Sequence, residues 1–304
     1  MKISPSKLTL GTAQLGLPYG ITNTLGLPSQ ESALNILNHA KKSGITTFDT
    51  APAYGEAETR LGQWIHNFGS MEKDQPIIIT KLPKFENNRN SSAANFVEKT
   101  IDQSLKTLKL QQIPLLLAHR AEDILNPAIY DSIISSKENG KIYSFGASVY
   151  DVDIAFELIE KTDISALQIP FSVADQRFVK SGLTSKARSK KITIFARSAF
   201  LQGVLLLSDT QIPEFLQELR IPVRMLNEIA AFNELSCANI LLRSVAHHSE
   251  ITSCVIGVES IVQLNTHITS YKKGPLPVHL SAEIFNLFND ISYETQNPGR
   301  WPKM

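Results

Sequence analysis

A chain of 304 residues can fill one large α/β barrel or two ordinary domains. Hydrophobic residues make up 42% of it and charged residues 19%, which is typical of a globular protein with a sizeable core. Lysine and arginine number 30 and aspartate and glutamate 29, so the formal net charge is +1. That balance creates no long-range field that would favour nucleic acid or an anionic membrane as a partner.

The cysteine count and the apolar runs indicate a compartment. Cys237 and Cys254 are too few for a disulfide framework and are typical of a reducing environment. The first residues contain no apolar signal region, and no apolar run approaches transmembrane length. We therefore expect a cytoplasmic protein that binds neither a membrane nor nucleic acid. No feature of the sequence indicates its oligomeric state.

Short apolar strands alternate with amphipathic helices along the chain. Ser29 and Asp151 are suited to cap two of these helices. The expected strands cover residues 8–13, 45–48, 77–80, 114–118, 144–148, 166–171, 192–196 and 253–258. The expected helices cover residues 30–43, 56–68, 96–108, 127–139, 151–161, 174–190, 223–247 and 261–271. An insertion at 205–222 and an amphipathic tail helix at 282–291 complete the pattern.

This alternation predicts one domain over residues 1–304, an α/β fold of the (β/α)8 TIM-barrel type with an additional C-terminal helix. No low-complexity linker divides the chain. The strands are short and uniformly apolar, as strands buried on both faces should be. The competing fold is a doubly wound open sheet. It is disfavoured because no Gly-x-Gly-x-x-Gly motif follows the first strand.

Four ionisable residues follow three consecutive strands. Asp49 ends the second strand and Tyr54 lies in the loop after it, while Lys81 and His119 end the third and fourth strands. Because the carboxyl ends of barrel strands meet at one mouth, we expect these side chains to converge there. Taken alone, Asp49 could equally be a helix cap or a loop residue.

The four side chains suit proton donation to a carbonyl group. A phenol is a weak acid near neutral pH, and a neighbouring ammonium such as that of Lys81 favours its ionised form. Asp49 would keep Lys81 charged and in position, since an unpaired buried charge is costly. His119 could hydrogen-bond the substrate oxygen and orient it.

The order and spacing of these residues resemble the aldo-keto reductase family, and the resemblance covers most of the chain. It is carried by Asp49-x4-Tyr54-Gly55-x-x-Glu58, by Thr80-Lys81 and by the Leu-Leu-Leu-Ala strand that ends at His119. Three later segments are also similar to the family: residues 140–148, which read GKIYSFGAS, Leu167-Gln168-Ile169, and residues 196–203.

The resemblance implies an NAD(P)H-dependent reductase that transfers a hydride directly to an aldehyde, ketone or sugar carbonyl. Tyr54 would be the general acid, tuned by Lys81 and Asp49, and His119 would orient the substrate. Cofactor contacts would come from strand ends and from the seventh-strand loop over the pyrophosphate. These contacts are Thr12, Ser148, Gln168, Arg197, Ser198, Gln202, Gly203, Gly257 and Glu259.

The eighth-strand loop departs from the NADPH-binding pattern of the family. It reads Gly257-Val258-Glu259-Ser260, and no lysine or arginine follows through His267. Glu259 would repel a 2′-phosphate but could accept hydrogen bonds from a ribose hydroxyl. We expect either NADPH or NADH as cofactor, with NADH bound no worse than NADPH. A solvated glutamate at a helix start is the alternative interpretation of Glu259.

Other features leave alternatives open. His247 and His248 are adjacent on a helix and lack a carboxylate pair, so we expect no metal site. Arg197 could also be an anion contact. Substrate specificity is expected in the loops at 83–91 and 205–222, and the tail with Trp301 is expected to cover part of the barrel.

The alternatives to a reductase are a slow cofactor-binding or regulatory barrel, and a non-redox sugar epimerase or dehydratase that reuses the four residues.

Overall fold

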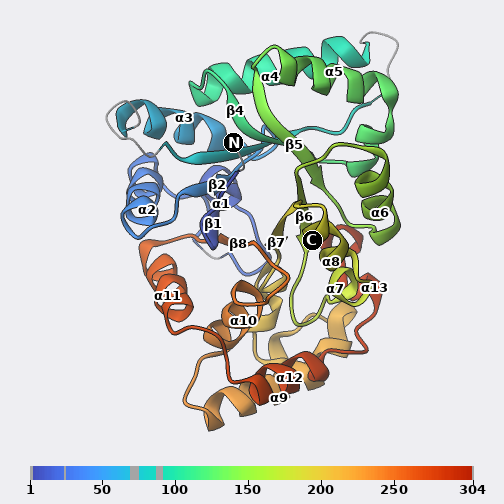
Figure 1. Cartoon of the computed structure of the whole chain (residues 1–304). Coiled ribbons are helices and arrows are strands. Elements are labelled where there is room, and N and C mark those ends of the chain that lie inside the picture. Colours follow the sequence, from blue (N-terminus) through green and yellow to red (C-terminus); the bar gives the residue numbers. More distant parts are fainter. Residues whose placement is uncertain (1–2, 24, 69–74, 87–91, 303–304) are drawn as a thin grey trace.

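Eight parallel strands close into a barrel in which β8 pairs with β1 (Figure 1). The structure is a computed structural model that describes residues 3–23, 25–68, 75–86 and 92–302. Within these residues the (β/α)8 prediction is confirmed. The strands are β1 (Leu8–Gly11), β2 (Thr47–Asp49), β3 (Ile77–Leu82), β4 (Ile113–Ala118), β5 (Ile142–Ser148), β6 (Ala166–Pro170), β7 (Thr193–Arg197) and β8 (Ser253–Gly257).

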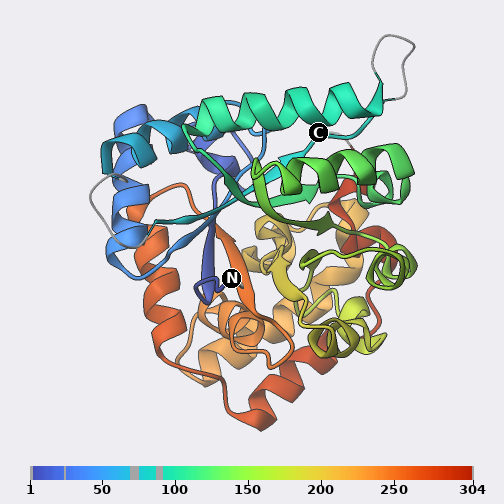
Figure 2. The same cartoon turned by 45° about the horizontal axis from the view of Figure 1, so that its top comes forward.

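Helices surround the barrel, and α4 and α5 lie side by side along one flank (Figure 2). The α-helices are α1 (Ala13–Gly16), α2 (Gln30–Lys42), α3 (Ala57–Phe68), α4 (Ala93–Leu108), α5 (Pro127–Glu138), α6 (Val152–Lys161), α7 (Arg177–Lys180), α8 (Leu183–Ser189), α9 (Arg220–Phe232), α10 (Cys237–Ala246), α11 (Ile261–Lys272), α12 (Val278–Leu287) and α13 (Tyr293–Gln296). The 3-10 helices are η1 (Ala121–Leu125), η2 (Leu201–Leu206), η3 (Asp209–Gln211), η4 (Glu214–Leu219) and η5 (Pro298–Arg300). No helix among the described residues is long and apolar enough to cross a membrane.

Alternate residues of each strand face different environments. The inward series forms a small core inside the barrel, built from Ile79, Leu115, Leu117, Ala166 and Phe195. The outward series joins the larger core between the strands and the surrounding helices. Both series are mostly apolar, and the inward hydroxyls of Thr9 and Ser253 hydrogen-bond each other at 2.7 Å. Truncating a fully buried side chain such as Phe195 to alanine would therefore cost about 3–5 kcal/mol.

Two long helices of the sequence-based prediction are divided in the structure. Residues 174–190 form α7 and α8, separated at Gly182, whose φ of 78° lies in the left-handed region. Residues 223–247 form α9 and α10, separated at Glu234, which has a φ of 55°. Ser236 begins α10 by accepting a hydrogen bond from the Asn239 amide, which is a standard N-cap. Helical periodicity continued through both breaks, so the pattern concealed them.

The C-terminal tail packs on the side of the barrel where the strands end. Its helix α12 starts earlier than predicted and lies beside α9 (Figures 1 and 2). Gln176, which follows β6, donates a hydrogen bond to the Phe285 carbonyl at 2.8 Å, and Trp301 packs against Phe215 of η4. At the opposite end of the barrel, Ile3 packs against the inner core. The described tail therefore supports the connections after β6 and β7.

Candidate active site

The inward series of the strands ends in a polar residue or a glycine at the carboxyl end of the barrel, except in β4, where the series ends at Leu117 and His119 follows just beyond the strand. It reaches Asp49 on β2, Lys81 on β3, Ser148 on β5 and Gln168 on β6. The register pairs Ser148 directly with Gln168 and aligns Gly11 with Asp49. The two-residue period that fills the barrel with apolar side chains thus delivers these polar groups to one mouth.

Lys81 and Asp49 form a buried ion pair. The Lys81 Nζ lies 2.7 Å from Asp49 Oδ1 and donates a second hydrogen bond to the Thr50 carbonyl at 3.0 Å. The Lys81 side chain is 1% exposed and that of Asp49 is 6% exposed. Burial by itself would lower the pKa of Lys81, but the negative charge of Asp49 and the neighbouring Tyr54 outweigh it, so the pKa is raised. Lys81 is therefore an ammonium at neutral pH.

The ring of Tyr54 lies against this ion pair. Lys81 Nζ is 4.9 Å from the centroid of the Tyr54 ring. The turn that carries Tyr54 packs closely against α1, where a Cβ at Gly16 would overlap the Tyr54 carbonyl oxygen. Glycine at position 16 is thus required for this close approach, which fixes the phenol at the cavity wall.

His119 completes the group and is neutral. Its ring is perpendicular to that of Tyr54, with the centroids 6.2 Å apart. Burial, reinforced by the positive charge of Lys81, lowers the pKa of His119 to about 4. The imidazole therefore carries no charge near neutral pH and can donate a single N–H to a substrate oxygen.

Asp49 is held by groups other than Lys81. The side-chain amide of Gln168 donates to Asp49 Oδ1 at 2.9 Å, and the Thr12 hydroxyl donates to the Asp49 carbonyl at 3.0 Å. Thr12 is thus buried behind Asp49, and its hydroxyl points to the backbone. These bonds tie the ends of β1, β2 and β6 together around the ion pair.

A cavity of about 640 Å3 opens at this mouth, a volume within the usual range of ligand sites. Most of the residues predicted from the sequence line it. They are Asp49, Tyr54, His119, Ser148, Gln168, Arg197, Ser198, Gln202, Gly203, Gly257 and Glu259. Lys81 and Thr12 are buried behind this wall. Of the two expected specificity loops, residues 205–222 contribute Leu206 to the wall, and residues 87–91 of the first loop lie outside the described part of the chain.

The loop after β7 reaches over the cavity and meets the loop after β1. Ser198, Gln202 and Gly203 all have positive φ values, of 67°, 53° and 93°. A Cβ at Gly203 would overlap the hydroxyl of Thr22, so the two loops approach each other more closely there than any side chain permits. The Gln202 amide also donates to the Tyr19 hydroxyl at 3.4 Å. Together these contacts bridge the cavity.

The end of the cavity beside β8 is lined by Glu259, Gln263 and His267. The Glu259 amide donates to the Gln263 side chain at 2.7 Å, and burial raises the pKa of the Glu259 carboxyl. His267 stacks on Phe200 with the ring centroids 5.0 Å apart, and its buried Nδ1 has no hydrogen-bond partner among the described residues. Burial lowers the pKa of His267 to about 4. No lysine or arginine among the described lining residues lies at this end.

Sequence reasoning missed four aromatic or imidazole side chains of the wall: Tyr19, Tyr150, Phe200 and His267. Tyr150 lies two residues beyond Ser148, so its position after a strand end was an available signal. Phe200 lies within the family-like segment 196–203, from which only other residues were predicted as contacts, whereas Tyr19 lies in a loop and His267 on a helix face where no period or motif marks them. Their contribution depends on loop geometry that only the tertiary structure provides.

The mouth of this (β/α)8 barrel therefore brings together a buried ion pair, a phenol and a neutral imidazole, groups of the kind that transfer protons in enzymes. The sequence model described as "Aldo/keto reductase family" matches residues 7–284, and the chain belongs to this family. It is accordingly an NAD(P)H-dependent oxidoreductase.

Individual relatives are distant. The chain is 24% identical over 295 residues to L-glyceraldehyde 3-phosphate reductase of Escherichia coli (strain K12), covering 86% of this chain and 84% of the relative. It is 28% identical over 213 residues to aldo-keto reductase YhdN of Bacillus subtilis (strain 168), covering 67% of this chain and 61% of the relative. The fold is similar to that of the aldo-keto reductase AKR11C1 from Bacillus halodurans in its holo form. The TM-score is 0.75 at 19% identity, and the alignment covers 94% of this chain and 95% of that structure.

Proposed function

We propose that this oxidoreductase reduces the carbonyl group of a small aldehyde, ketone or sugar to an alcohol, with Tyr54 as the proton donor. The observation that supports this assignment is the buried Lys81–Asp49 ion pair, whose ammonium lies 4.9 Å from the centre of the Tyr54 ring. A lysine buried to this extent is costly without a function or a partner. Here the partner keeps it charged beside a phenol that faces the cavity.

In the proposed reaction, Tyr54 donates its hydroxyl proton to the carbonyl oxygen of the substrate. The phenolate that remains is stabilised by the Lys81 ammonium, and Asp49 maintains that charge. His119 is neutral and donates an N–H to the same oxygen, which orients the carbonyl. A nicotinamide cofactor, when bound, would supply the hydride that reduces the carbonyl carbon. Solvent then returns a proton to Tyr54.

The wall of the cavity has groups that fit a nicotinamide cofactor. The Ser148 hydroxyl has no hydrogen-bond partner within the described part of the chain. The side-chain amide nitrogen of Gln168 donates a hydrogen bond to Asp49, so the side-chain oxygen of Gln168 remains available as an acceptor. These two side chains would hold the carboxamide. Ser198, Gln202 and Gly203 would hold the pyrophosphate under the bridging loops.

The β8 end supports binding of NADH at least as tightly as NADPH. Gly257 and Glu259 would face the adenosine ribose, where a carboxylate accepts hydrogen bonds from a 2′-hydroxyl and repels a 2′-phosphate. A bidentate arginine or a lysine is the usual means of holding that phosphate. Fluorescence titration of both cofactors tests this proposal, which is wrong if NADPH binds tenfold or more tightly.

The proposed reaction is tested by comparing the wild type with Tyr54→Phe. Short aldehydes and sugars, beginning with glyceraldehyde and its 3-phosphate because one relative is named for that substrate, are added to enzyme and cofactor. Loss of cofactor absorbance is then followed. We expect turnover in the wild type and a decrease of roughly 10^2–10^4-fold in Tyr54→Phe with unchanged cofactor affinity. Tyr143→Phe, at the opposite end of the barrel, is the matched control and retains activity.

The outcomes separate the alternatives. Cofactor binding without turnover of any carbonyl would indicate a binding or regulatory barrel. Conversion of a sugar with no net change in cofactor absorbance would indicate epimerase or dehydratase chemistry. Turnover that survives in Tyr54→Phe would remove Tyr54 from its proposed role.

A further inference from the structure

Arg197, the last residue of β7, lies in the cavity wall with its guanidinium stacked on an aromatic ring. Its Cζ is 4.0 Å from the centroid of the Tyr150 ring. Its hydrogen bonds are long: Nη1 donates to the Ser198 hydroxyl at 3.3 Å and Nη2 to the Val149 carbonyl at 3.4 Å. The contacts therefore place the guanidinium beside the end of β5, next to Ser148.

No carboxylate of the described residues forms an ion pair with Arg197. Two arginines that follow other strands do form ion pairs: Arg120 with Asp123, and Arg177 with Asp175 at 2.8 Å. Arg197 is also the only lysine or arginine among the described residues that line the cavity. A guanidinium with spare donors, facing an enclosed space, is suited to bidentate binding of a carboxylate or a phosphate.

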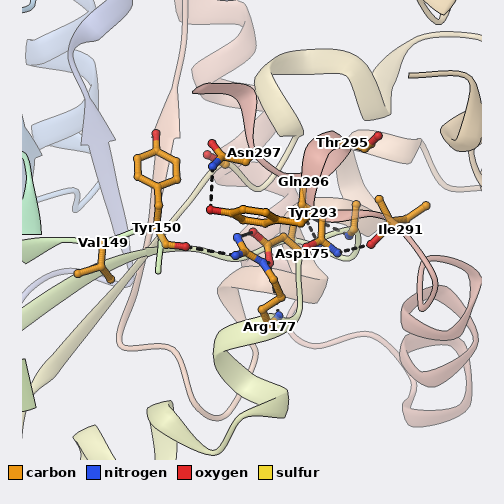
Figure 3. Close-up of polar contacts among 12 residues, drawn as sticks. Val149, Tyr150, Asp175, Arg177, Ile291, Tyr293, Thr295, Gln296 and Asn297 are labelled. Carbon is orange, nitrogen blue, oxygen red and sulfur yellow. Dashed lines mark hydrogen bonds and ion pairs between the residues drawn. The ribbon is translucent and has the colours of Figure 1, made fainter. Parts of the chain in front are cut away.

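A series of contacts supports the backbone of Tyr150, on whose ring Arg197 stacks. Arg177 Nη1 donates to the Tyr150 carbonyl at 3.2 Å, and Asp175 holds Arg177 through two bonds of 2.9 and 2.8 Å. The ring of Tyr293, from the tail helix α13, covers Arg177 at 4.4 Å from its centroid. Figure 3 shows this sequence of contacts from the tail to Tyr150. The backbone of Tyr150 is thus held in place, and its ring covers one face of the Arg197 guanidinium.

The guanidinium lies near the reacting groups. Its positive charge contributes to lowering the pKa of His119, after burial and the charge of Lys81. The charges of Lys81 and Asp49 neutralise each other, and the lowered pKa of His119 leaves its imidazole uncharged near neutral pH. Arg197 is therefore the one cation without a counterion among the described residues of the cavity wall. It lies at the end of the cavity formed by the tetrad, that is, by Asp49, Tyr54, Lys81 and His119.

We propose that Arg197 binds an anionic group of the substrate, so that the preferred substrates are carbonyl compounds bearing a carboxylate or a phosphate. This inference rests on the proposed carbonyl reduction and names its substrate class. The resemblance implied a cofactor contact for Arg197, and the present proposal assigns it to the substrate instead, because its guanidinium contacts Tyr150 and Val149 just beyond the end of β5.

The test uses substrates in pairs that differ in the anionic group. D-glyceraldehyde is compared with D-glyceraldehyde 3-phosphate, and D-glucose with D-glucuronate, so that phosphate and carboxylate are examined separately. The wild type, Arg197→Gln, Arg197→Lys and the control Arg224→Gln on the exposed face of α9 are assayed with a saturating cofactor. We expect kcat/KM of the wild type to be at least tenfold higher for one anionic member of a pair. Arg197→Gln should lower the ratio of kcat/KM for the anionic member to kcat/KM for the neutral member at least tenfold, Arg197→Lys should restore part of that ratio, and Arg224→Gln should retain it.

Calorimetric titration of glucuronate and glucose 6-phosphate into the cofactor complex gives an answer independent of turnover. Anion binding that is lost in Arg197→Gln supports the site even if no carbonyl is reduced, in which case only the proposed reaction fails. An equal loss for both members of each pair, together with weaker cofactor binding, would assign Arg197 to the cofactor and overturn the inference. A wild type that prefers the neutral members and binds neither anion would overturn it as well.

Discussion

At the tetrad end of the cavity, Lys81 and Asp49 are almost fully buried and form an ion pair at 2.7 Å. At the β8 end, Glu259 is partly exposed, and its backbone amide donates a hydrogen bond to the Gln263 side chain. Asp49, Lys81 and His119 lie on strands or immediately after them, where the barrel register fixes their positions, whereas Tyr54 lies in the turn that packs against α1. The β8 groups lie on a loop and a helix. In the proposed function, proton transfer depends on groups held by the rigid barrel, while cofactor preference depends on residues that can be exchanged at little cost to the fold.

The largest effect is expected from Lys81→Met. Removal of one partner leaves Asp49 buried without its counterion, which should lower the free energy of unfolding by about 3–5 kcal/mol. Turnover should fall at least as far as in Tyr54→Phe. Urea denaturation measures the stability, and Lys81→Met/Asp49→Asn should recover most of it without recovering activity. If the single variant were as stable as the wild type, the tetrad end would not be the electrostatically demanding end of the cavity.

Gly203→Ala tests the bridge that joins the two ends. The new Cβ would overlap Thr22, and the φ of 93° is strained for alanine, so we expect a loss of roughly 2–3 kcal/mol and weaker cofactor binding. Gly182→Ala is the matched control. It has a similar φ of 78° but no atom within 4 Å of the added Cβ, and it should cost only about 1 kcal/mol. Equal costs in the two variants would show that the bridge is not tightly packed.

A pH titration of stability addresses His267 at the β8 end. Burial lowers its pKa from 6.5 to about 4, so the unfolded chain binds more protons than the folded chain between these values. Stability must therefore fall as pH decreases from 6.5 toward 4. His267 should contribute about 2 kcal/mol of that decrease. In His267→Phe the decrease should be smaller by that amount, measured by denaturant unfolding at pH 7 and pH 4.5, while the contribution of His119 persists. An unchanged decrease would show that His267 titrates normally.

The smallest effect is expected from Glu259→Arg. Replacing the carboxylate by a guanidinium should tighten NADPH binding about tenfold, or roughly 1.4 kcal/mol, and leave NADH nearly unaffected. Glu259→Gln should give a smaller change in the same direction. Because Glu259 lies on a loop at the cavity edge, thermal stability should stay within about 0.5 kcal/mol of the wild type. An unchanged NADPH affinity in Glu259→Arg would place the 2′ position of the ribose elsewhere.

The candidate residues at strand ends were predictable from the sequence, because an ionisable side chain directly follows a run of buried apolar residues there. Asp49, Lys81 and His119 each follow an apolar run, and the barrel places such positions together. Thr12 was predicted as a mouth residue from the same logic, yet its hydroxyl is bonded to the Asp49 carbonyl at 3.0 Å. Position at a strand end does not determine which way a side chain turns when a neighbouring backbone acceptor competes for it.

The breaks at Gly182 and Glu234 and the contacts of the tail were not predictable in the same way. Helical periodicity in the sequence indicates which face of a helix is buried. When the chain changes direction between two helices that pack on the same core, the periodicity continues and does not reveal the break. The stack of Arg197 on Tyr150 joins β7 to the end of β5, and Tyr293 supports it from 143 residues beyond Tyr150. No local pattern encodes contacts between such distant segments.

The sequence by itself determined the barrel and the candidate tetrad, because a two-residue strand period, a strand–helix alternation and the spacing of ionisable residues are local properties of the chain. The tertiary structure alone decided the charge states of Lys81 and His119, the closure of the loops at Gly203 and the orientation of Arg197. Those depend on desolvation and on packing between segments remote in sequence, and both arise only when the chain is folded.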